Sequence, residues 1–154
     1  MRDIDNKVTT AKLENVPEII ALCYKNFNEN GVDLPKPDTV TAVKAMSEFI
    51  NDGLAFVKKD ENGKIVGVLV LTPFTFWWSE EVVLHTATIY VLPEYRDKNV
   101  FDELVEEAKA YSSYMGAKLY SDILIVDDLD KKDKLMRIKG FKKTGSIYKF
   151  EDKI

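Results

Sequence analysis

The segment from Val82 to Val126 constrains the fold more than any other part of the chain. Its first part, Val82–Leu92, is rich in valine, leucine and threonine and predicts a β-strand. Apolar residues then recur at helical spacing from Val100 to Met115, which predicts an amphipathic helix stopped by Gly116. Leu119–Val126 is nearly continuously apolar after its first residues, as expected of a strand buried on both faces. A strand, a helix and a strand in this order predict a right-handed crossover that places two parallel strands side by side.

The residues before this segment predict two helices after a short first strand at Lys7–Ala11. Asn15 and Glu18 have the spacing of a capping box, which predicts that Asn15 caps the first helix. The helix is expected to end before the loop GVDLPKPD, because the two prolines of this loop cannot continue a helix. Asp38 is expected to cap the second helix and Gly53 to end it.

Strand patterns are the main feature of the next part of the chain. Leu54–Lys59 and Ile65–Trp77 predict a hairpin that turns at ENG. Beyond the crossover, a short helix is predicted at Lys131–Lys139 and a last strand at Ser146–Glu151. The resulting order is β-α-α-β-β-β-α-β-α-β. It predicts an α/β (α+β) fold with a mixed, mostly antiparallel central sheet flanked by helices, in a single domain over residues 1–154.

The composition excludes several kinds of site. The 154 residues include one cysteine, Cys23, and one histidine, His85. An intramolecular disulfide, a thiolate metal cluster and a multi-histidine metal site are therefore excluded, and we expect no metal cofactor. The net charge of −4 argues against specific nucleic-acid binding and leaves cationic substrates open.

The sequence also bears on location. No apolar run approaches the ~18 residues that a membrane-spanning helix needs, so no membrane partner is expected. The stretch MRDIDNK lacks the apolar core of a signal peptide, and a single cysteine fits a reducing compartment. We therefore expect a cytoplasmic protein. The sequence leaves open whether it forms a homodimer.

The predicted order of elements, together with three stretches, resembles the GCN5-related N-acetyltransferase (GNAT) superfamily. Glu14–Phe27 is similar to its opening helix, Ile89–Tyr120 to its acetyl-CoA motif, and Lys134–Phe150 to its closing helix, Gly-Phe pair and final strand. The resemblance implies an acyl-CoA N-acyltransferase fold formed by one domain. It also implies transfer of an acetyl group from acetyl-CoA to a primary amine of a small molecule, protein or peptide, by direct attack in a ternary complex.

The resemblance further implies a place for the cofactor. The pyrophosphate would bind main-chain N–H groups at the N-terminus of the long helix, and the pantetheine would pair with the end of the preceding strand. The residues implied in cofactor binding are Tyr90, Val91, Leu92, Arg96, Asp97, Lys98, Asn99, Val100 and Phe101.

Two of these residues replace glycines that the family carries in this loop. Asn99 stands at the first glycine, and asparagine tolerates left-handed backbone, so the turn can be kept. Phe101 stands at the second. Its ring either occupies pyrophosphate space or turns inward beside Leu104 and Val105.

The resemblance points to His85 as a general base. It lies eleven residues before Arg96, where histone-type members carry a glutamate base, and imidazole suits the same task. The alternative is a structural strand histidine. The usual donor to the leaving thiolate, a tyrosine four residues before the Gly-Phe pair, is replaced by Met136. Tyr148 is the candidate substitute, with Tyr120 as another.

Trp77 and Trp78, near the hairpin tip, are candidates for binding the acceptor, because the family can place this region at the acceptor end of its cleft. On a strand, one indole is expected to point inward and the other outward. The alternative to an enzyme is a non-catalytic interaction protein of this fold that has lost acetyl-CoA binding. The replacement of both loop glycines, and of the tyrosine expected four residues before the Gly-Phe pair, supports this alternative.

Overall fold

The computed structural model describes residues 7–30, 34–122, 129–146 and 148–151. The chain divides into two compact units, Met1–Asp122 and Ile123–Ile154, and each is treated by itself. The expectation of one domain over residues 1–154 stays a prediction.

Unit 1 is built on a five-stranded sheet in which neighbours in space are also neighbours in sequence. The strands are β1 Thr9–Thr10, β2 Ala55–Lys59, β3 Ile65–Thr75, β4 Val82–Val91 and β5 Leu119–Ser121. The pairings from β1 to β4 are antiparallel, and β4 pairs with β5 in parallel. The predicted mixed, mostly antiparallel sheet is therefore confirmed, as is the pair of parallel strands joined by a helix.

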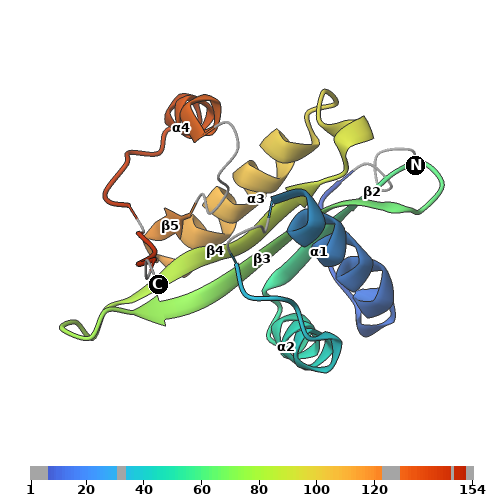
Figure 1. Cartoon of the computed structure of the whole chain (residues 1–154), viewed down its shortest axis with the longest axis horizontal. Helices are drawn as coiled ribbons and strands as arrows, with labels where there is room; N and C mark the ends of the chain where they lie inside the picture. Colours follow the sequence, from blue (N-terminus) through green and yellow to red (C-terminus); the bar gives the residue numbers. More distant parts are fainter. Residues whose placement is uncertain (1–6, 31–33, 123–128, 147, 152–154) are drawn as a thin grey trace. The chain divides into compact units, whose positions relative to one another are not determined.

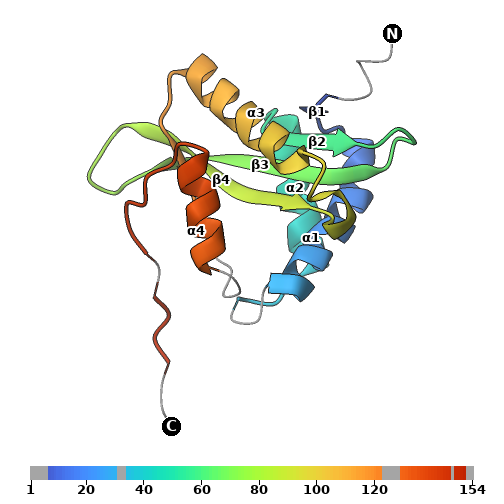
Figure 2. The same cartoon turned by 90° about the horizontal axis from the view of Figure 1, so that it is seen from above.

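Helices cover both faces of this sheet. The helices α1, Val16–Asn30, and α2, Thr39–Asn51, lie on one face, and α3, Val100–Met115, lies on the other (Figures 1 and 2). Two short 3-10 helices, η1 at Leu13–Asn15 and η2 at Pro93–Tyr95, precede α1 and α3. The core lies between the helices and the apolar residues of β2, β3 and β4.

The predicted N-terminal cap is confirmed for α2 but not for α1. Asp38 caps α2 as predicted. The capping box predicted for α1 is wrong: Asn15 Oδ1 accepts from the Lys12 N–H at 2.8 Å and so closes η1. Glu18 Oε1 accepts instead from the N–H of Ile65, the first residue of β3, at 2.8 Å. A tertiary partner therefore takes the carboxylate that the local pattern assigned to the helix end.

The last part of unit 1 corrects the predicted strand Leu119–Val126. β5 ends at Ser121, and its side chains are half-buried rather than buried. The reason is its place in the sheet, where β4 is its one neighbour among the described strands. Residues 123–126 lie outside the described residues.

Unit 2 contains the helix α4, Leu129–Ile138, which begins before the predicted Lys131 and is followed by Gly140 at φ 92°. The strand predicted at Ser146–Glu151 is not found in its described residues, which are 146 and 148–151. A strand needs a neighbour for its main-chain groups, and the described part of unit 2 holds no other strand.

One glycine of β3 sets how closely α3 approaches the sheet. A Cβ atom at Gly67 would lie 2.8 Å from Val100 Cγ1 and 3.1 Å from Leu104 Cδ1. Since Val100 and Leu104 are buried, neither side chain has open space to move into. The missing side chain of Gly67 therefore fixes the position of the N-terminal end of α3.

We predict that Gly67→Ala destabilises the protein by about 1–3 kcal/mol, because overpacking forces α3 or its side chains to shift. Thermal unfolding measures this as a lower Tm. Gly145→Ala is the matched control, because a Cβ there meets nothing within 4 Å. Equal Tm values for the two variants would contradict the close approach.

Candidate functional site

The candidate site begins where β4 loses its neighbour. β5 pairs with β4 only at Leu84, His85 and Thr86, whereas β4 runs on to Val91. Leu92 donates its N–H to the Val66 carbonyl oxygen of β3 at 2.9 Å. By the alternation of a strand, the main-chain groups of residues 89 and 91 face the opposite edge. No strand in the described part of the chain pairs with this edge beyond Thr86.

The loop that follows turns through a left-handed residue. Asn99 has φ 62° and ψ 9°, and it is the one non-glycine among the described residues with positive φ. The prediction that Asn99 keeps the turn is confirmed. Its side chain does not cap α3, so the first-turn N–H groups lack that acceptor.

The ring of Phe101 is turned toward the core. Phe101 is half-buried and packs against the hydrophobic core on which α3 rests. Of the two alternatives left by the sequence, the structure supports the inward one. The benzyl group therefore does not stand over the helix end.

A cluster of charged and aromatic groups holds the start of this loop to α1. Arg96 Nη1 and Nη2 donate to the two carboxylate oxygens of Glu29 at 2.6 and 2.8 Å. Arg96 Nε donates to the Val91 carbonyl oxygen at 3.0 Å. Tyr90 donates its hydroxyl hydrogen to Glu29 at 2.9 Å, and the Arg96 guanidinium lies 5.5 Å from its ring centre. Burial and this hydrogen bond raise the pKa of Tyr90 to about 12.

A second contact holds the loop from the other side. Asp60, in the turn between β2 and β3, accepts from the N–H groups of Asn62 at 2.9 Å and Lys64 at 3.0 Å. It also accepts from the hydroxyl of Tyr95 in η2 at 3.0 Å. Desolvation raises the pKa of Asp60, but these hydrogen bonds outweigh it and hold the pKa below its ordinary value.

An open pocket of about 380 Å³ lies between α1, the end of β4 and η2. Its lining residues are Lys25, Asn28, Glu29, Tyr90, Leu92, Pro93 and Glu94. The predicted cofactor residues Tyr90 and Leu92 are among them. The sequence reading missed Glu29 and Asp60, because each acts on a segment far away in sequence.

A β-bulge lies in β4 near the point where β5 ends. Thr86 pairs with Leu71 and Thr88 with Val70, so Ala87 has no residue opposite it on β3. An extra residue of this kind shifts the alternation of side chains by one position.

The bulge brings His85 onto the same face as Tyr90. Their partners on β3, Thr72 and Val68, are four residues apart, so both side chains point to one side of the sheet. This is the side of α1, because Tyr90 reaches Glu29 there. Without the bulge, His85 and Tyr90 would lie on opposite faces of the sheet, because they are five residues apart and side chains alternate along a strand.

His85 has a carboxylate partner. Its Nε2 lies 2.6 Å from Oδ2 of Asp122, which directly follows β5. Next to this pair, the hydroxyls of Thr86 and Ser121 are hydrogen-bonded at 2.6 Å. The sequence reading missed Asp122, because it lies within the apolar strand predicted there.

The candidate donors of a proton to the leaving thiolate lie in different units of the chain. Tyr120 pairs with His85 in the parallel register, so their side chains share a face. Met136 and Tyr148 lie in unit 2, whose residues are described separately from this site. Tyr148 as a substitute donor therefore stays a prediction.

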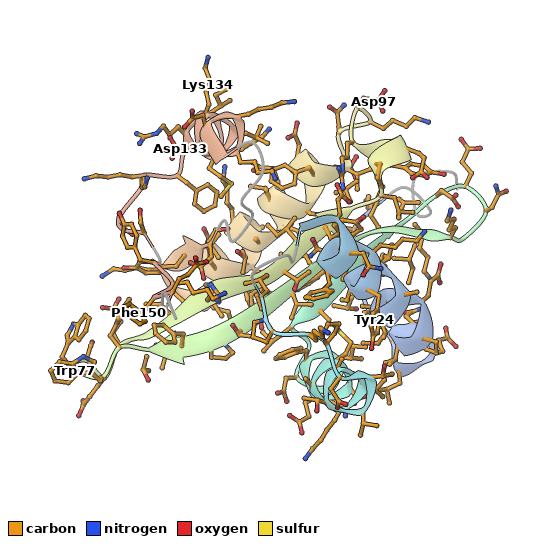
Figure 3. All side chains as sticks on the ribbon, in the orientation of Figure 1. Tyr24, Trp77, Asp97, Asp133, Lys134 and Phe150 are labelled. Carbon is orange, nitrogen blue, oxygen red and sulfur yellow. The ribbon has the colours of Figure 1, made fainter. Side chains whose placement is uncertain are left out.

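The two tryptophans lie at the tip of the β3–β4 hairpin. Trp77 is 92% and Trp78 65% exposed, so the expectation of one inward indole is wrong. The reason is that both residues are in the turn rather than on the strand, where alternation would apply. Figure 3 shows Trp77 at the opposite end of the sheet from Asp97 of the loop. Their role in acceptor binding stays a prediction.

Membrane-spanning helices and metal clusters are both absent from the described residues. None of the described helices is both long and apolar enough to span a membrane. Within the same residues, no group of three or more histidine, cysteine, aspartate or glutamate side chains is placed to hold a metal ion.

The fold of this chain is shared with solved structures of acetyltransferases. The solved structure of aminoglycoside 6'-N-acetyltransferase AAC(6')-IG from Acinetobacter haemolyticus is similar, with a TM-score of 0.69, 18% identity and coverage of 96% of this chain and 99% of that one. A possible acetyltransferase from Clostridium difficile 630 has a TM-score of 0.71, 17% identity and coverage of 95% and 97%. AAC(6')-Iy, in complex with the bisubstrate analogue CoA-S-monomethyl-acetylneamine, has a TM-score of 0.72, 14% identity and coverage of 96% and 98%.

The sequence comparison identifies the family. The model of the acetyltransferase (GNAT) family matches residues 16–128, so the chain belongs to this family. None of the curated proteins matches the chain.

The Asp60 contact predicts a pH-dependent stability. Since its pKa is lowered in the folded state, its carboxylate stabilises the fold above the unfolded-state pKa of about 3.9. This stabilisation is lost as the pH falls through the folded-state pKa. Asp60→Asn is therefore expected to lower Tm at about pH 7 and to approach the wild-type Tm near about pH 3.

Thermal melts over this pH range measure the effect. Glu61→Gln removes a neighbouring carboxylate from the same exposed turn and serves as the control, with little expected change in Tm. A Tm loss in Asp60→Asn that is equal at every pH would show that the carboxylate charge is not the cause.

Proposed function

We propose that the chain transfers the acetyl group of acetyl-CoA to a primary amine of a small molecule or peptide, by direct attack in a ternary complex. The observation that carries the proposal is the edge of β4 beyond Thr86, which pairs with no described strand and leads straight into the left-handed turn at Asn99 and the N-terminus of α3. This arrangement offers main-chain groups to an amide-bearing chain and helix N–H groups to a phosphate.

The residues at this edge fit acetyl-CoA. The main chain of residues 89 and 91 faces outward and can pair with the pantetheine amides, although Arg96 Nε already binds the Val91 carbonyl oxygen. The N-terminus of α3 can bind the pyrophosphate, because the ring of Phe101 packs toward the core. When bound, acetyl-CoA supplies an activated acetyl thioester.

Three observations support a cationic amine as acceptor. The chain carries a net charge of −4, which attracts cations. Glu94 adds an exposed carboxylate to the pocket at the end of β4, where Glu29 is already paired with Arg96. Two structurally similar proteins are aminoglycoside 6'-N-acetyltransferases by name. In the proposed reaction, His85 accepts the proton that the amine must lose.

The first prediction of this proposal concerns binding. Acetyl-CoA at about 100 times its dissociation constant should stabilise the protein by about 2.7 kcal/mol, seen as a higher Tm. Asn99→Gly should keep this shift, since glycine adopts positive φ. Asn99→Val should lose most of it, because a β-branched residue disfavours that backbone.

The same Tm measurements can also contradict the proposal. An unchanged wild-type Tm at millimolar acetyl-CoA would favour the non-catalytic alternative. A shift that survives in Asn99→Val at the same size would show that the cofactor binds elsewhere.

The second prediction concerns His85. His85→Gln should lower kcat for acetylation of an amine such as neamine by about 100-fold or more, because a general base contributes that much. The Tm shift with acetyl-CoA should remain, since His85 is not among the cofactor residues. A loss of only a few-fold in kcat would rule out the base role.

A further inference from the structure

The starting observation is the short contact between the one histidine of the chain and an aspartate. His85 Nε2 and Asp122 Oδ2 are 2.6 Å apart, and the side chains are 28% and 39% exposed. The pair sits where β4 and β5 part, since the last β4–β5 pair is Thr86 with Ser121. It therefore borders the open edge on the same face as Tyr90.

The chemistry of the contact assigns the proton. An ionised carboxylate only accepts hydrogen bonds, so the imidazole nitrogen facing it must carry the hydrogen. Nε2 is that nitrogen. In neutral imidazole the other nitrogen then keeps a free lone pair, so Nδ1 is the atom that can take a proton.

We propose that Asp122 is a positioning residue that holds His85 in the Nε2–H tautomer and thereby makes Nδ1 the proton acceptor of the reaction. This inference rests on the proposed function. The carboxylate also stabilises the imidazolium that forms when Nδ1 is protonated, as an opposite charge in contact does.

The bonding changes balance. Nδ1 of His85 accepts a proton from the amine nitrogen while that nitrogen forms its bond to the acetyl carbon. The electron pair of the broken C–S bond stays on the coenzyme A sulfur, which is protonated from solvent. His85 then returns its proton to solvent, which both exposed side chains can reach.

The rest of the strand end supports a dedicated geometry. The hydrogen bond between the hydroxyls of Thr86 and Ser121 fixes the residues next to both members of the pair. The bulge at Ala87 is what turns His85 to this face. A histidine with a purely structural role would show the same tautomer beside this carboxylate, so kcat is the readout that separates the two roles.

The direct test reads the tautomer. The ¹⁵N NMR spectrum of the imidazole needs no assignment, because His85 is the single histidine. In the wild-type protein without ligands, at a pH where the ring is neutral, Nε2 should appear protonated and Nδ1 unprotonated. Asp122→Asn should raise the population of the Nδ1–H form, because its amide group can donate to Nε2.

The kinetic test uses the same variants. Asp122→Asn should lower kcat by about tenfold or more, as loss of an orienting partner does, with KM for acetyl-CoA nearly unchanged. Asp122→Glu keeps a carboxylate and should recover part of kcat. Asp52→Asn makes the same change at an exposed aspartate that follows α2 and should keep both the tautomer and kcat.

Each outcome decides between the two proposals. An Nδ1–H tautomer in the wild type, or an unchanged tautomer and kcat in Asp122→Asn, would overturn the role of Asp122. An Nε2–H tautomer in a protein that neither binds acetyl-CoA nor acetylates amines would leave the tautomer assignment standing and refute the proposed function.

Discussion

The parting of β4 from β5 after Thr86 is the constraint on which the rest of the site depends. A strand whose outer edge is paired along its length offers no main-chain groups to a ligand. Here β5 ends at Ser121, so the last residues of β4 are held by β3 on one side and pair with no described strand on the other. The short strand, the pocket beside Tyr90 and the pair of His85 with Asp122 all border this opening.

Side-chain contacts hold the loop between β4 and α3 in place. The left-handed turn is made by Asn99. Arg96 is held to the end of α1 by Glu29, and Tyr95 is held to the β2–β3 turn by Asp60. A loop fixed at both sides keeps the N-terminus of α3 in place without relying on flexible backbone. The loop is therefore held from both sides in a chain that belongs to an acetyltransferase family.

Much of the fold was predictable from local patterns. The strands from Ala55 to Val91 and the helix from Val100 follow from apolar periodicity, and the cap at Asp38 from a local hydrogen bond. The errors came where a distant partner decided. Glu18 bonds β3 instead of its own helix, and the strand from Leu119 ends at Ser121, with β4 as its one neighbour among the described strands.

The sequence by itself determined the order of the elements as far as α4, the family and the turn at Asn99, because these depend on residues near one another in the chain. Only the tertiary structure decided which way Phe101 points and which face His85 occupies. The first depends on packing of α3 against the core. The face that His85 occupies depends on the register shift between β3 and β4, and its partner Asp122 directly follows β5. Such contacts join residues far apart in the chain, and no local pattern encodes them.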